Sequence, residues 1–68
     1  MVFVFKTTVK TRKDILNLSV FLDQFKYSKW NFDLEDCDNI LRIESKLNIV
    51  EEVIIGLNTR GFKCTELE

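Results

Sequence analysis

Residues 2–9 of this 68-residue chain are rich in β-branched and aromatic types, and in an extended chain every second one of them would share a face. This pattern predicts a β-strand, because successive strand residues point to opposite faces. One of those faces would carry Phe3, Phe5, Thr7 and Val9. From residue 12 to residue 25 the hydrophobic period changes to three and four, which predicts an amphipathic helix. Its apolar stripe comprises Ile15, Leu18, Phe21, Leu22 and Phe25.

Two more strands are predicted in the middle of the chain. Residues 29–34 alternate between polar and apolar types, and residues 40–44 place Leu41 and Ile43 on one face. The polar residues 35–39 between them are typical of a turn, so the two strands form a predicted hairpin.

The last third of the chain predicts a helix followed by a strand. Asn48 is a suitable N-cap, and Glu51, three residues later, can reach back to the amide of Asn48. Gly61 is expected to end the helix, because glycine adopts the left-handed conformation there without a Cβ penalty. Residues 62–67 form the last predicted strand. The apolar stripe of the predicted second helix comprises Val50, Val53, Ile54 and Leu57.

This order of elements predicts an α+β fold. We expect a ferredoxin-like βαββαβ sandwich, a four-stranded antiparallel sheet with two helices on one face. Residues 1–68 form a single domain, because a chain of this length has no room for a second core. The open face of the sheet would carry Val2, Val4 and Leu67, a weakly apolar surface for a partner or a second copy.

Composition narrows the function classes. A hydrophobic content of 46% favours a packed globule, and a net charge of −1 gives no general attraction to nucleic acid or acidic membranes. The chain has no histidine, no evident nucleophile–base pair and no glycine-rich phosphate loop, so we expect no enzymatic activity. No secretory signal or membrane-spanning segment is visible. We therefore expect a cytoplasmic protein with reduced thiols.

The segment that opens the first helix carries a family resemblance. The run Val9-Lys10-Thr11-x-x-Asp14-Ile15-x-x-Leu18 resembles the start of the heavy-metal-associated (HMA) domain of copper chaperones and metal-pumping ATPases. In that family the pattern is Met-x-Cys-x-x-Cys. The segments from Trp30 to Glu44 and from Glu51 to Phe62 resemble the hairpin and the second helix of small HMA-like proteins. The resemblance covers nearly the whole chain and implies the same βαββαβ fold.

Thr11 and Asp14 stand where that family has its two metal-binding cysteines. The resemblance implies a site in which two thiolates hold copper(I) or another soft metal such as zinc. Threonine is no ligand for soft metals, and aspartate offers a hard oxygen. We therefore expect no metal and no cofactor at these positions. The same pair also suits an ordinary helix start, with Thr11 as the cap and Asp14 near the positive end of the helix dipole.

Basic residues surround this loop. Lys6, Lys10, Arg12 and Lys13 lie in it or beside it, and positive charge in the first helical turn opposes the helix dipole. Two interpretations stay open: a solvated surface, or a site for an anion or an acidic protein partner. Phe62 lies at a neighbouring turn, where packing on the helices is expected. We name Lys10, Arg12, Lys13 and Phe62 as candidate partner-binding residues.

The two cysteines are expected at opposite edges of the sheet, Cys37 in the hairpin turn and Cys64 in the last strand. Three strand spacings of roughly 4.8 Å would separate them, too far for a disulfide or a shared ion. Cys64 is expected to be a small buried residue. The leading hypothesis is a non-enzymatic HMA-like interaction module that has lost its thiolate site. The alternative is a copper or zinc chaperone or sensor that uses Cys37 from each chain of a homodimer.

Overall fold

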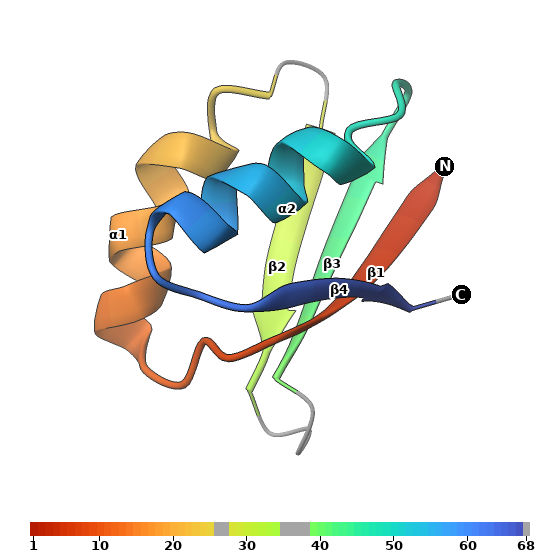
Figure 1. Ribbon diagram of the computed structural model, residues 1–68. Coiled ribbons are helices and arrows are strands. Elements are labelled where there is room, and N and C mark those ends of the chain that lie inside the picture. Colours follow the sequence, from red (N-terminus) through yellow and green to blue (C-terminus); the bar gives the residue numbers. More distant parts are fainter. Residues whose placement is uncertain (26–27, 35–38, 68) are drawn as a thin grey trace.

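A computed structural model describes residues 1–25, 28–34 and 39–67. Six elements follow one another in the predicted order (Figure 1): β1 Val2–Thr7, α1 Arg12–Leu22, β2 Ser28–Asp33, β3 Ile40–Ser45, α2 Val50–Thr59 and β4 Cys64–Leu67. The α+β class is therefore confirmed. Within the described ranges, no helix has the length and apolar character that crossing a membrane requires.

The four strands form one antiparallel sheet in the order β2-β3-β1-β4. The first strand of the chain is thus an inner strand of the sheet. Phe5 of β1 pairs with Leu41 of β3 on one side and with Glu66 of β4 on the other. Both helices lie on the same side of this sheet, as predicted, and leave its other face open (Figure 1).

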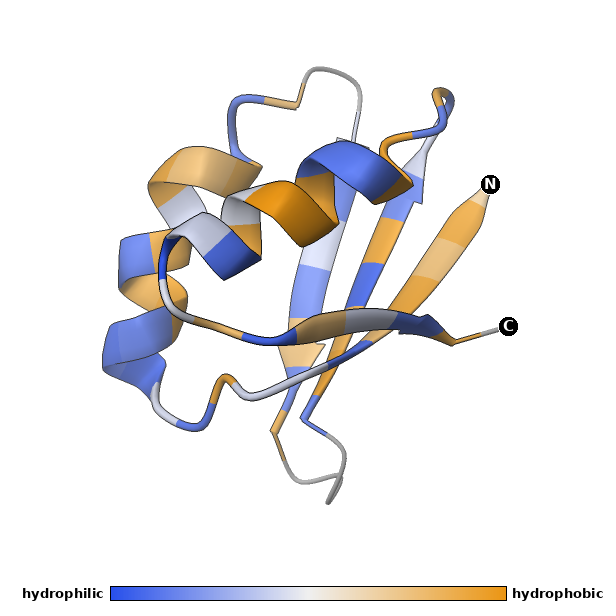
Figure 2. Ribbon diagram, viewed as in Figure 1, coloured by the Kyte–Doolittle hydropathy of each residue, from blue (hydrophilic) through white to orange (hydrophobic). Residues whose placement is uncertain are grey.

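The core lies between the sheet and the two helices. The shared face predicted for residues 2–9 is confirmed, because Phe3, Phe5, Thr7 and Val9 are all buried. Hydrophobic and hydrophilic residues also alternate along β3 (Figure 2). Burying these side chains is the main source of stability, at about 25 cal/mol per Å² of apolar surface. The fully buried members of the core are Phe5, Val9, Leu18, Leu22, Leu41, Ile43, Val53 and Leu57.

Helix α1 is shorter than predicted. It ends at Leu22, and single turns follow, in which the amide of Gln24 donates to the Phe21 carbonyl and that of Phe25 to the Leu22 carbonyl. Phe25 still packs against the core. The spacing of apolar residues therefore predicted the correct buried face of α1. The same spacing continues to Phe25, however, beyond the point where the helix ends.

Helix α2 begins one residue later than the sequence predicted. Its N-cap is Ile49, which makes no side-chain capping bond, and among the described residues Glu51 makes no bond back to the Asn48 amide, so that half of the predicted capping box is wrong. Asn48 still satisfies one amide, because its side-chain oxygen accepts the N–H of Val50 at 3.1 Å. At the other end Gly61 has a φ of +90°, which confirms its predicted left-handed role after the helix.

Candidate functional site

The loop that resembles the HMA metal loop forms an ordinary helix start. Thr11 is the N-cap of α1, with extended backbone, and its hydroxyl oxygen accepts the amide N–H of Asp14 at 3.1 Å. Asp14 lies in the first turn, where its carboxylate faces the positive end of the helix dipole. The capping interpretation is therefore confirmed.

Basic side chains surround this helix start. Lys10, Arg12 and Lys13 are all exposed. Lys6 is exposed too, but it belongs to β1, where the alternation of the strand places it on the open face of the sheet. The positive charge therefore spreads from the loop and the first turn of α1 onto the neighbouring part of the sheet.

Lys63 joins this region, although the sequence reasoning did not name it. Its backbone amide donates to the hydroxyl of Thr8 at 2.9 Å, and its carbonyl accepts the amide of Thr8 at 3.1 Å. These two bonds hold the residue before β4 beside the loop after β1. The signal was present in the expected ferredoxin-like fold, which places the loop after the first strand and the turn after the second helix at the same end of the molecule. We call Lys10, Arg12, Lys13 and Lys63 the basic end.

Phe62 is half-buried and packs against the hydrophobic core, as expected from the sequence. Its amide donates to the carbonyl of Leu57 at 3.0 Å, which ties it to the end of α2. Most of its side chain is therefore used in folding. Of the four predicted partner-binding residues, the three cations are exposed, whereas Phe62 is only partly exposed.

Cys64 is a buried residue of the core cluster, as the sequence predicted. Burial raises the pKa of its thiol from 9.0 to about 11, because a thiolate in apolar surroundings loses its hydration. At neutral pH the side chain is a neutral thiol, which is a poor nucleophile and a poor metal ligand. Cys37 lies outside the described residues, so its predicted exposure stays a prediction.

Strand order separates the two segments that carry the cysteines. Cys64 begins β4 at one edge of the sheet, whereas β2, which leads into the hairpin, forms the opposite edge. Among residues 1–25, 28–34 and 39–67, no three His, Cys, Asp or Glu side chains gather in a way that could hold a metal ion.

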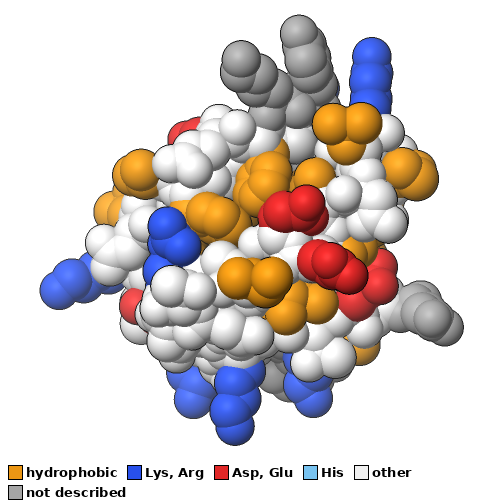
Figure 3. Space-filling view, turned by 45° about the horizontal axis from the view of Figure 1, so that its top comes forward, with side chains coloured by type: hydrophobic (Ala, Val, Ile, Leu, Met, Phe, Trp, Pro, Cys, Tyr) orange, Lys and Arg blue, Asp and Glu red, His pale blue; other side chains and the backbone are white. Residues whose placement is uncertain are grey.

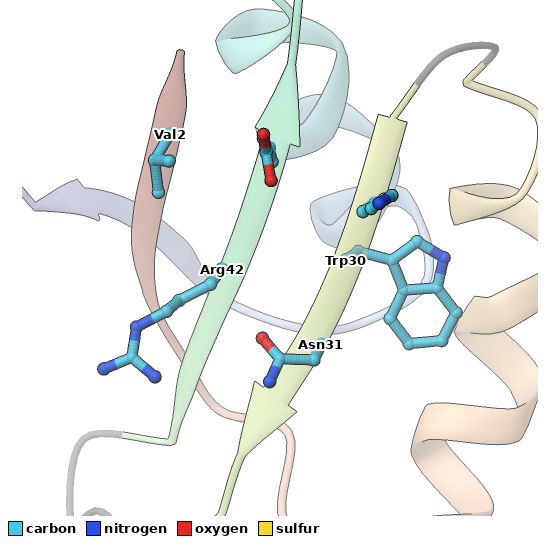
Figure 4. Close-up of a pocket in the computed structure, with 6 residues that line it drawn as sticks. Val2, Trp30, Asn31 and Arg42 are labelled. Atoms are coloured by element: carbon cyan, nitrogen blue, oxygen red, sulfur yellow. The ribbon is translucent and has the colours of Figure 1, made fainter.

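A shallow hollow of about 320 Å³ lies over β1, β3 and β2. Val2, Arg42 and Asn31 line it from three neighbouring strands, while the indole of Trp30 turns toward α1 (Figure 4). There the Trp30 ring N–H donates to a carboxylate oxygen of Asp23 at 2.9 Å. Charges of both signs meet around the hollow, since Lys29 and Glu44 are cross-strand partners. The hollow therefore favours neither an anionic nor a cationic ligand.

Comparison of the chain with protein-family models, with curated proteins and with solved structures finds no match.

Proposed function

We propose that this chain is an HMA-like domain with a ferredoxin-like fold that works without a thiolate metal site. The support for the fold is the strand order β2-β3-β1-β4, with every neighbouring pair antiparallel and both helices on one face. The support for the family is the sequence at the start of α1, where Thr11 and Asp14 stand at the positions of the two family cysteines.

The proposed activity is non-enzymatic binding of an acidic protein in the cytoplasm, through the basic end. The observation that carries this proposal is the gathering of exposed cations around the N-terminus of α1. Positive charge in a first helical turn opposes the dipole and costs about 0.3–1 kcal/mol per residue. Arg12 and Lys13 therefore weaken the helix they belong to, and a complementary surface on a partner offsets that cost.

Charge reversal tests the binding site. The protein is immobilised and used at low salt to capture binding partners. Each captured protein is then purified, and its affinity for wild type and for each variant is measured. Arg12→Glu with Lys13→Glu should weaken binding by about tenfold or more, and added salt should weaken it in wild type. The matched control is Lys29→Glu with Lys46→Glu, because both lysines are exposed and lie away from the basic end. Equal affinities for the two double variants would contradict the proposal.

A metal titration tests the family assignment. The reduced protein is titrated with copper(I) and with zinc against a chelator of known affinity. Wild type should not compete, whereas Thr11→Cys with Asp14→Cys should bind one soft metal per chain, since thiolates are the ligands that such ions prefer. Binding by wild type at one metal per two chains, lost in Cys37→Ser, would instead support the chaperone or sensor alternative.

A further inference from the structure

The outward face of α1 carries large hydrophobic side chains in contact with water. Leu16 is 70% exposed and Val20 is 69% exposed, and they lie one helical turn apart. This face is opposite the buried stripe that contains Leu18. Arg12 and Lys13, both exposed, precede Leu16 by four and by three residues. The outward surface of α1 is therefore basic in its first turn and apolar in the next.

The outward face of α2 has the same arrangement with the opposite charge. Ile55 is 64% exposed. Glu51 and Glu52, both exposed in the first turn of the helix, precede it by four and by three residues. In Figure 3 acidic side chains lie beside exposed hydrophobic ones near the centre of the view, whereas basic side chains gather mainly along its lower and left margins.

The two helices thus match each other in spacing and in charge. A rise of 1.5 Å per residue puts each charged pair about 5 Å along the axis from its apolar residue. We propose that α1 of one copy packs in parallel against α2 of a second copy, with Leu16 on Ile55. Arg12 and Lys13 then face Glu51 and Glu52. This inference rests on the proposed function, because it identifies the acidic partner of the basic end as the chain itself.

The contact is small and heterologous. A contact between two helices of about three turns each is expected to bury less than the roughly 1,000 Å² that a specific interface normally exceeds, so the association should be weak. Because α1 meets α2 and not another α1, the contact leaves a second α1 and a second α2 available. Such contacts propagate unless a ring closes. The expected species at high concentration are therefore dimers and larger oligomers in exchange with the monomer.

Sedimentation equilibrium on the full chain, at concentrations up to about 1 mM, tests the inference. Wild type should self-associate at low salt, and half-molar salt should weaken the association by about tenfold, because exposed ion pairs are screened. The variant Arg12→Glu with Lys13→Glu has two acidic helix faces, and Glu51→Lys with Glu52→Lys has two basic ones. Neither variant should self-associate, but an equimolar mixture of the two should associate.

Two controls separate this contact from general attraction and from loss of fold. Lys29→Glu with Lys46→Glu makes the same change in net charge as the α1 variant and leaves both outward faces intact, so it should self-associate like wild type. Glu51→Gln with Glu52→Gln removes the negative charge of the α2 face and keeps residues that suit a helix. Circular dichroism reports whether each variant is folded. Leu16→Ser, at an exposed position, should also reduce self-association.

A monomer at every concentration, or failure of the mixed variants to associate, overturns the inference. If a different acidic protein still binds wild type and depends on Arg12 and Lys13, the proposed function stands and the second copy is excluded as its partner.

Discussion

At the scale of the residue, Gly56 has a role that the sequence pattern does not reveal. It lies in the middle of α2, where alanine would ordinarily stabilise the helix by about 1 kcal/mol. The ring of Phe21 occupies the space that a Cβ would need. That ring is held in place, because the Arg60 guanidinium lies 4.4 Å from its centroid and Phe25 packs edge-on against it at 5.2 Å.

Gly56→Ala should therefore destabilise the protein by about 1–2 kcal/mol, since overpacking outweighs the gain in helix propensity. Urea denaturation measures the change. The matched background is Phe21→Leu, in which the same substitution should be much less harmful because the ring is gone. A stabilised Gly56→Ala protein would show that Phe21 moves aside without cost.

The thiol of Cys64 makes a prediction about pH. Its pKa is raised from 9.0 to about 11 in the folded protein, so the unfolded chain loses this proton first as pH rises. The contribution of Cys64 to stability is complete below pH 9 and is lost between pH 9 and pH 11, by up to about 2 kcal/mol. The difference in unfolding free energy between wild type and Cys64→Ala should shrink over that range. A difference that stays constant would mean that the thiolate is solvated in the fold.

At the scale of the element, the start of α1 depends on one side chain. Thr11→Ala removes the oxygen that accepts the Asp14 amide and should cost about 1 kcal/mol of stability. Thr11→Ser keeps this acceptor and should remain close to wild type. Thermal unfolding measures both variants, and equal losses would assign the effect to the threonine methyl group and not to the cap.

The sequence predicted the type and order of all six elements, because each buried face repeats with the period of its own geometry. Phe3 and Phe5 mark a strand at period two, and Leu18 and Leu22 mark a helix near period four. Element ends were less predictable, since they depend on contacts from distant segments. The strand β1 ends at Thr7, two residues before the predicted end, and the next residue, Thr8, still bonds Lys63, a residue far along the chain.

Part of the candidate site was predictable, because some of its residues are close together in the sequence. Lys10, Arg12 and Lys13 are neighbours in sequence and needed only the position of one helix start. Lys63 required the pairing of β1 with β4, and the matching faces of α1 and α2 required the knowledge that Leu16 and Ile55 are exposed and not buried. Hydrophobic periodicity predicts which face of a helix is buried. A single apolar residue on the opposite face belongs to no repeating pattern, so the sequence does not show that it is exposed.

At the scale of the whole molecule, β4 completes the fold although it has only four residues. A chain that ends at Lys63 loses the strand that pairs with β1 and the buried Cys64, and it should not fold at room temperature. A domain of this size has only several kcal/mol of stability to lose. Circular dichroism with a urea titration measures the outcome. The control ends at Leu67 and should unfold cooperatively like the full chain.

The inner position of β1 also shapes how the protein reaches its native state. Phe5 must meet Leu41 and Glu66, so the sheet closes only when residues from both ends of the chain come together. The chain loses conformational entropy when these long loops close, and it does so before the strand pairs can compensate. Folding is therefore expected to be slower than that of helical bundles of the same length. During synthesis β1 is made before β4, so β1 must wait for this partner strand. Until then the apolar face of β1 is exposed to aggregation, and the rate at which the residues between the two strands are synthesised sets how long that exposure lasts.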